Sequence, residues 1–169
     1  IPSAIEYRIE DEQQSKDALE ALAKALNGQE CQVQETTLLK ATAISDHLPD
    51  EYNISGEEIR TPGFECMSLT DYNTLLNSQG KESTISELRD TECVLVKYRP
   101  APENKDVGAV YRLNFGKGST TDVTVVQTTL NNPIGFANSV ATLLVSDRLY
   151  QTITSGQPEQ ITVVSINGG

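Results

Sequence analysis

Apolar and polar residues alternate along several short stretches of the chain, which is the pattern of strands with one buried face. The clearest examples are residues 3–10 and the pair 107–115 and 121–129. That pair flanks the turn Gly116-Lys117-Gly118, so we expect the two stretches to form a hairpin. Further strands are expected over residues 31–44 (as one long strand or two shorter ones), 64–67, 91–98, 141–145 and 160–166.

Apolar residues at helical spacing mark three further stretches, each with its own start or stop signal. The first is expected to begin at the N-cap Ser15 and to stop at Asn27-Gly28. The second begins at Ser68 and ends at Gly80. Ser68 and the aspartate three residues later have the spacing of a capping box. The third covers residues 146–154.

The order of these elements predicts one α+β domain over residues 1–169. We expect a mixed, mostly antiparallel sheet with about three helices packed against one of its faces. Two strand-to-helix junctions resemble each other, the one at Met67-Ser68 and the one at Val145-Ser146. In both, a Tyr follows the Ser by four residues, and an aliphatic residue follows that Tyr by three. The junctions are either two similar βα units or two unrelated examples of ordinary capping.

The formal net charge is −11, from 24 acidic and 13 basic residues. A field of this sign repels nucleic-acid phosphates and attracts basic surfaces, although an excess of acid also serves solubility alone. The acidic residues of the expected loop 46–63 have few apolar neighbours to desolvate a carboxyl for acid catalysis. We interpret them as a solvated surface and as the best candidate contact for a cationic ligand or basic partner: Asp46, Asp50, Glu51, Glu57 and Glu58.

Residues that could support catalysis or bind a metal are few. His47 is the single histidine, and the cysteines lack the paired spacing of zinc ligands. We expect Cys31, Cys66 and Cys93 to be reduced and buried, with one disulfide plus a free thiol as the alternative. The sequence therefore predicts a protein that is not an enzyme and uses no cofactor and no metal. A small thiol hydrolase that pairs Cys66 or Cys93 with His47 is the least favoured alternative.

Two segments resemble a known family. Residues 67–81, MSLTDYNTLLNSQGK, are similar to the segment "hydrophobic-Ser-Leu-Ser-Asp-Tyr-Asn, two Leu, Gly-Lys" of FtsX-like permeases. Residues 144–150, LVSDRLY, are similar to a later segment of the same family, "Val-Val-Ser-Asp, then Tyr". These permeases are membrane subunits of bacterial ABC transporters, and both segments belong to their large extracellular domain. The resemblance covers about half of the chain, and residues 1–60 match it only in the order of their elements.

The resemblance implies an extracellular (periplasmic-type) domain that is inserted between two transmembrane helices at the cell membrane. Its partners would be the membrane-embedded remainder of the permease and a separate ATPase subunit. Its role would be to bind a ligand or partner, such as a cationic peptide or a lipid-linked molecule, and to couple binding to helix movement in antimicrobial-peptide or lipid and lipoprotein export. Unpaired thiols depart from the usual exported domain. A free-standing or lipid-anchored secreted binding protein is the alternative.

Overall fold

In a computed structural model, the protein is described over residues 4–9, 31–44, 63–97, 106–116, 118–134 and 141–168, together with five single positions between 13 and 24. Eight strands form one sheet. The strands are β1 (Ala4–Ile9), β2 (Cys31–Ile44), β3 (Gly63–Ser68), β4 (Glu92–Val96), β5 (Val110–Asn114), β6 (Thr120–Thr129), β7 (Ala141–Val145) and β8 (Gln160–Gly168), and the helices are α2 (Leu69–Ser78) and α3 (Asp147–Ser155).

Most of the expected elements are confirmed. Residues 31–44 form a single long strand, and β5 and β6 pair as the predicted hairpin. Gly116 and Gly118 both have positive φ angles, 87° and 75°, which is the conformation that glycine tolerates best in such a turn. The first expected helix is described at only five positions. Gln13 is already helical, two residues ahead of the predicted N-cap Ser15.

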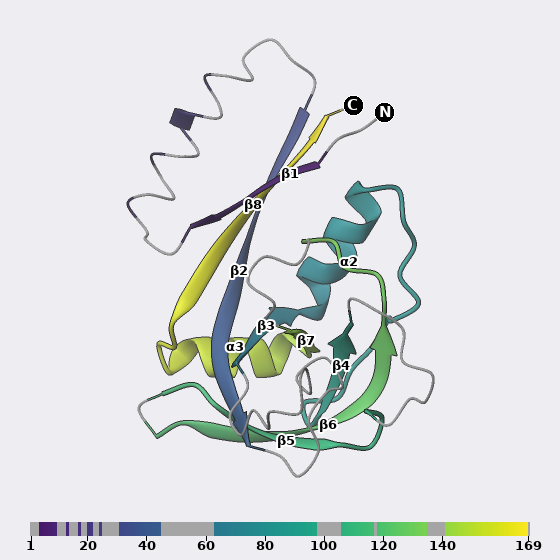
Figure 1. The fold of residues 1–169 in the computed structure, drawn as a ribbon, viewed down its shortest axis with the longest axis vertical. Helices are drawn as coiled ribbons and strands as arrows, with labels where there is room; N and C mark the ends of the chain where they lie inside the picture. The colour runs from purple at the N-terminus through teal and green to yellow at the C-terminus, as the bar shows by residue number, and fades with distance from the viewer. Residues whose placement is uncertain are drawn as a thin grey trace, which may run out of the picture.

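The sheet closes on itself to form a ring of six strands. Its order is β1-β8-β2-β3-β7-β4-β6-β5, and β5 pairs back with the end of β2. Two pairings are parallel, β3 with β7 and β4 with β6, and the others are antiparallel, as the sequence predicted. Figure 1 shows the ring in the lower half of the molecule, while β2 and β8 extend upward from it to β1.

The two helices cover different faces of the sheet, which corrects the expectation that all helices pack on one face. Alternate residues of the ring strands point inward and form one core, which Leu149 and Ile153 of α3 join. The residues between them point outward and form a second core with Tyr72, Leu75 and Leu76 of α2. The strands at the centre of the sheet are therefore buried on both faces, which explains their continuous apolar runs.

The first segment that resembles the permeases builds α2 and its two ends. The Ser68 hydroxyl oxygen accepts a hydrogen bond from the Asp71 N–H at 3.2 Å and caps the helix, as predicted. Gly80 has a φ of 76°, and the Lys81 N–H donates to the Leu76 carbonyl across it at 2.9 Å, so the helix ends in a Schellman motif. The segment therefore specifies a helix with defined ends.

Candidate functional site

The larger of the two cavities described below lies where β2 changes its neighbour along one edge. β2 pairs with β8 as far as Leu39 and with β5 from Thr42 onward. Between these points the Lys40 N–H donates to the carbonyl of Glu159 at 2.8 Å. Since β8 and β5 diverge from the same edge, they leave a gap, and a cavity of about 490 Å³ occupies it. This size is in the range of small-ligand sites.

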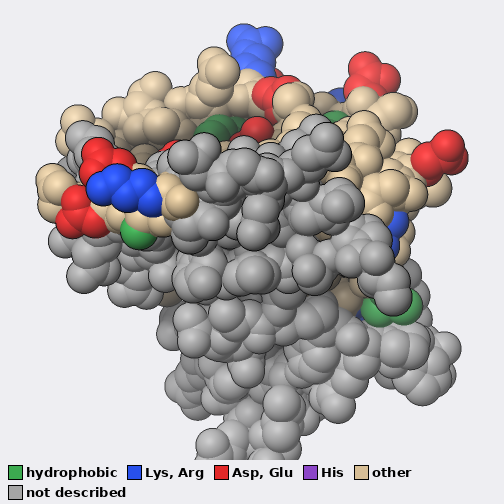
Figure 2. Space-filling view, turned by 90° about the horizontal axis from the view of Figure 1, so that it is seen from above, with side chains coloured by type: hydrophobic (Ala, Val, Ile, Leu, Met, Phe, Trp, Pro, Cys, Tyr) green, Lys and Arg blue, Asp and Glu red, His purple; other side chains and the backbone are tan. Residues whose placement is uncertain are grey.

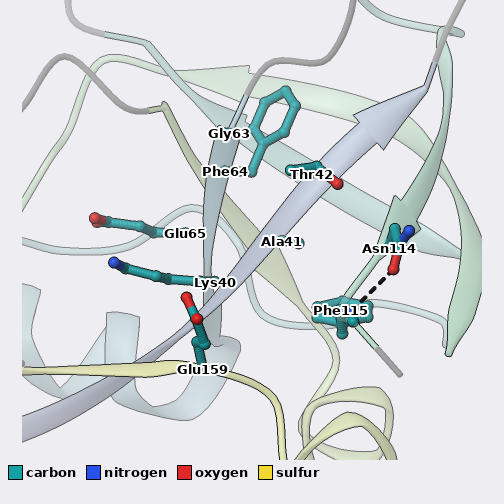
Figure 3. A pocket seen from close by; sticks show the side chains of 10 residues that line it. Lys40, Ala41, Thr42, Gly63, Phe64, Glu65, Asn114, Phe115 and Glu159 are labelled. Atoms are coloured by element: carbon teal, nitrogen blue, oxygen red, sulfur yellow. Dashed lines mark hydrogen bonds between the residues drawn. The ribbon is translucent and has the colours of Figure 1, made fainter. Parts of the chain in front are cut away.

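Three charged side chains line one side of this cavity (Figure 3). Lys40 and Glu65 are direct cross-strand partners on β2 and β3, and their side chains extend in the same direction. The carboxylate of Glu159 points toward them from the start of β8. Glu65 is only 2% exposed, and an opposite charge directly across the ladder offsets part of the cost of burying it.

The turn of the hairpin lines another side of the cavity, with Phe115 as its apolar residue and Asn114 as a polar one. Phe115 follows β5, and the Asn114 side-chain oxygen accepts from the Gly116 N–H at 2.8 Å, which fixes the turn beside it (Figure 3). The lining residues include no cysteine, histidine or serine among the described part of the chain. One ammonium group, two carboxylates and an aromatic wall can hold a ligand that combines a polar, preferably cationic, group with an apolar part.

A second cavity, of about 380 Å³, lies at the carboxyl ends of the parallel strands β3 and β7, where both helices begin. Asp147, the first residue of α3, binds the first turn of α2. One of its carboxylate oxygens accepts from the Thr70 N–H at 3.0 Å, and the other accepts from the Thr70 hydroxyl. A carboxylate at this position satisfies a free N–H of the helix and favours its dipole. The two βα junctions are therefore joined to each other.

The second segment that resembles the permeases supplies this junction. The Ser146 hydroxyl oxygen accepts from the Leu149 N–H at 3.1 Å, and its own hydrogen is donated to Asp90 at 2.7 Å. The Tyr150 hydroxyl donates to the Thr37 carbonyl of β2 at 2.5 Å. These polar residues of the segment thus have structural partners. The two similar junctions correspond to two neighbouring parallel strands, each of which is followed by a helix with a serine cap.

Burial at the junction raises the pKa values of two groups. The pKa of the half-buried Asp71 carboxyl is raised chiefly by burial; the hydrogen bond to Ser68 opposes the shift, and the charge of Asp147 adds to it. Burial also raises the pKa of Tyr150 to about 12, with smaller contributions from Asp71 and Cys66. Both shifts disfavour additional negative charge in this cavity.

As the pH rises from about 3 to about 7, the free energy of unfolding of an Asp71→Asn variant should increase relative to that of the parent. The increase should be less than about 1 kcal/mol, because the Asp71 charge is half exposed. A raised folded-state pKa means that the parent loses stability as Asp71 deprotonates, and asparagine avoids this loss. Chemical denaturation at several pH values measures the trend. Asp122→Asn is the control with the opposite sign, because the hydrogen bond from Arg112 lowers the pKa of Asp122. Parallel trends for the two variants would contradict the assignment.

Two of the three thiols are confirmed as free and buried inside the ring, Cys66 on β3 and Cys93 on β4. Burial raises the pKa of Cys66, and it raises that of Cys93 to about 12. Both thiols are therefore protonated at neutral pH, whereas a nucleophile or a metal ligand must be a thiolate. The side chain of Cys31 lies outside the described part of the structure.

The site predicted from the sequence cannot be compared with these cavities. Asp46, Asp50, Glu51, Glu57, Glu58 and His47 all lie outside the described residues. On the described part of the face in Figure 2, acidic and basic side chains lie scattered among polar ones. Sequence reasoning missed Lys40, Glu65 and Glu159. Their identities gave no signal of proximity, since their association depends on pairing between distant strands.

Comparison with known proteins does not test the resemblance to the permeases. No protein-family model matches the chain, and no curated protein matches its sequence. Among the described residues, no helix has the length and apolar character needed to cross a bilayer. The same residues contain no cluster of three or more side chains suited to hold a metal ion.

Proposed function

We propose that this chain is the extracytoplasmic domain of a bacterial ABC transporter permease of the FtsX-like type. It binds a ligand or partner outside the membrane and couples that binding to movement of the flanking transmembrane helices. The membrane-embedded remainder of the permease and a separate ATPase subunit are its partners in this proposal. The ligand is a cationic peptide or a lipid-linked molecule, and the domain lies at the outer face of the cell membrane.

The observation that carries the proposal is the pairing of the first strand with the last. β1 and β8 are antiparallel neighbours, with Ala4 opposite Asn167. The chain therefore enters and leaves the fold at the same corner, where Figure 1 places the N and C marks together. This arrangement suits a domain that is inserted between two adjacent membrane helices, because both connections then reach the same patch of bilayer.

The same strands offer a path from the larger cavity to the ends of the fold. β8 begins at Gln160, next to the cavity residue Glu159, and ends beside β1. β2 runs antiparallel to it over nine register pairs and reaches the cavity at Lys40. A strand of nine residues spans about 30 Å. A ligand that contacts the cavity differently in two states of the transporter would shift the balance between these states through the two strands.

The intact gene product tests this function. We expect apolar spans of about 20 residues on both sides of the chain, long enough to cross the bilayer. In cells that express the full-length protein, a protease added outside should cleave an epitope-tagged copy of this domain without lysis. A signal sequence before the chain with no span after it would instead establish the secreted or lipid-anchored binding protein. Spans on neither side, or protection from the protease, would refute the proposal.

A further inference from the structure

A row of three alternating charges crosses the sheet at the larger cavity. Lys40 on β2 is the direct partner of Glu65 on β3, and on its other side the Lys40 N–H donates to the carbonyl of Glu159 at 2.8 Å. The three side chains lie together along one side of the cavity (Figure 3). Because neighbouring strands are roughly 4.8 Å apart, a ligand cation that reaches either carboxylate also approaches the ammonium group of Lys40. A ligand that carries a cation alone is therefore attracted and repelled by the same row.

The charges and the size of the cavity select the ligand. A ligand that brings a cation to the exposed Glu159 and an anion to Lys40 meets an opposite charge at both contacts. Phe115 adds an apolar surface on which the methylene groups of a basic side chain can pack. The volume of about 490 Å³ has room for one such residue. We propose that the cavity binds a basic residue with a free α-carboxylate, with its side-chain cation at Glu159 and its carboxylate at Lys40.

The turn that carries Glu159 contains a backbone outlier. Gln157 has a φ of 56°, and among the described residues it is the single non-glycine residue with a positive φ. It lies between the end of α3 and the buried Pro158, directly before Glu159. Side chains rarely tolerate this conformation, and residues held in it cluster at sites that bind ligands. The outlier is thus a second feature, besides the charges, that favours a ligand site at this end of the cavity.

This inference rests on the function proposed above for the role of the ligand in transport, and it names the group that the domain would recognise. A basic side chain and a free α-carboxylate occur together in the C-terminal residue of a cationic peptide and in a free basic amino acid. Binding is measured on the 169-residue chain without flanking spans. A failure to bind therefore leaves the topology test of the full-length protein unaffected, and a failure of that test leaves the binding result unaffected.

Four small molecules test the chemistry of the ligand in titrations followed by amide NMR. Nα-acetyl-lysine, which mimics a C-terminal basic residue, should bind with a Kd of about 1 mM or tighter, as its size allows. It should bind at least about tenfold more tightly than its amide, which lacks the carboxylate, and than Nα-acetyl-norleucine, which lacks the cation. Free lysine distinguishes the two sources. If it binds more tightly than Nα-acetyl-lysine, the ligand is a free amino acid; if more weakly, it is the end of a peptide.

Charge variants locate the binding site. Glu159→Gln should weaken the binding of Nα-acetyl-lysine about tenfold and leave that of Nα-acetyl-norleucine unchanged, because Glu159 holds the cation. Glu87→Gln is the matched control, since it removes the same charge from an exposed residue that does not line the cavity. It should change the binding of neither molecule. Lys40→Gln should reduce the preference for Nα-acetyl-lysine over its amide. The NMR spectrum verifies that each variant is folded.

Three results would overturn the proposal. The first is equal affinity for Nα-acetyl-lysine and its amide, which would remove the carboxylate from the recognised group. The second is a Glu159→Gln variant that binds Nα-acetyl-lysine as tightly as the parent does; this arm decides the question even if Lys40→Gln fails to fold. The third is no binding of any of the four molecules up to about 10 mM, which would mean that the row of charges serves the fold alone.

Discussion

Replacing Lys97 with Met should lower the free energy of unfolding by about 3–5 kcal/mol, the usual cost of removing one partner from a buried ion pair. The Lys97 Nζ lies 2.5 Å from the Asp106 carboxylate, and the two side chains are 5% and 0% exposed. Methionine retains most of the apolar stem but leaves the carboxylate buried without the ammonium group. Urea denaturation of parent and variant measures the loss.

Two further variants make this result specific. The double replacement Lys97→Met with Asp106→Leu should recover much of the stability, because it removes the buried charge along with its partner. Arg112→Met breaks the solvent-exposed pair with Asp122, whose side chains are 62% and 52% exposed, and should have far less effect. A Lys97→Met loss no larger than that of Arg112→Met would show that the buried pair does not stabilise the fold as argued.

The position of this pair explains why the effect should be large. Lys97 directly follows β4, and its N–H donates to the Thr129 carbonyl of β6 at 2.8 Å. The carbonyl of Asp106 accepts from the Ala109 N–H at 3.1 Å just before β5 begins. The ion pair therefore joins the two ends of the connection between β4 and β5. Losing it should loosen the side of the ring where β6 lies between these strands.

Features encoded by neighbouring residues could be predicted from the sequence. The caps at Ser68 and Ser146, the stop at Gly80 and the hairpin turn each depend on a few consecutive residues, and each is confirmed. The apolar run at 93–96 also indicates more than the strand that was predicted from it. Four successive apolar residues in a strand indicate two buried faces, and in the structure Cys93 and Leu95 point into the ring while Val94 and Val96 face α2.

Closure of the ring could not be predicted in the same way. Thr42 pairs with Asn114, which lies 72 positions away along the chain, and alternation within each strand does not reveal its partner. The cavity beside Lys40 exists because β8 and β5 share one edge of β2, so it depends on the same long-range pairing. The local pattern of apolar and polar residues does not show that β2 changes its partner from β8 to β5. The candidate site could therefore not be predicted from the sequence either.

Phe64→Ala should cost about 3–5 kcal/mol of stability and should enlarge the cavity at the same time. Phe64 is 1% exposed and packs on Tyr111 inside the ring of strands, with the centroids of the two aromatic rings 5.2 Å apart and their planes at 49°. It also lines the cavity beside Lys40, so its side chain separates the core from the candidate ligand site. Thermal and urea unfolding measure the loss. Phe64→Leu should cost less, and Val110→Ala, at a position that is 50% exposed, should change little.

The enlarged space provides a direct test of this dividing wall. An apolar cavity left by a deleted aromatic ring can bind benzene, and a ligand that binds only the folded state raises stability by mass action. Benzene should therefore raise the melting temperature of Phe64→Ala more than that of the parent or of Val110→Ala. Equal shifts in all three proteins would mean that the ring interior has collapsed around the missing side chain.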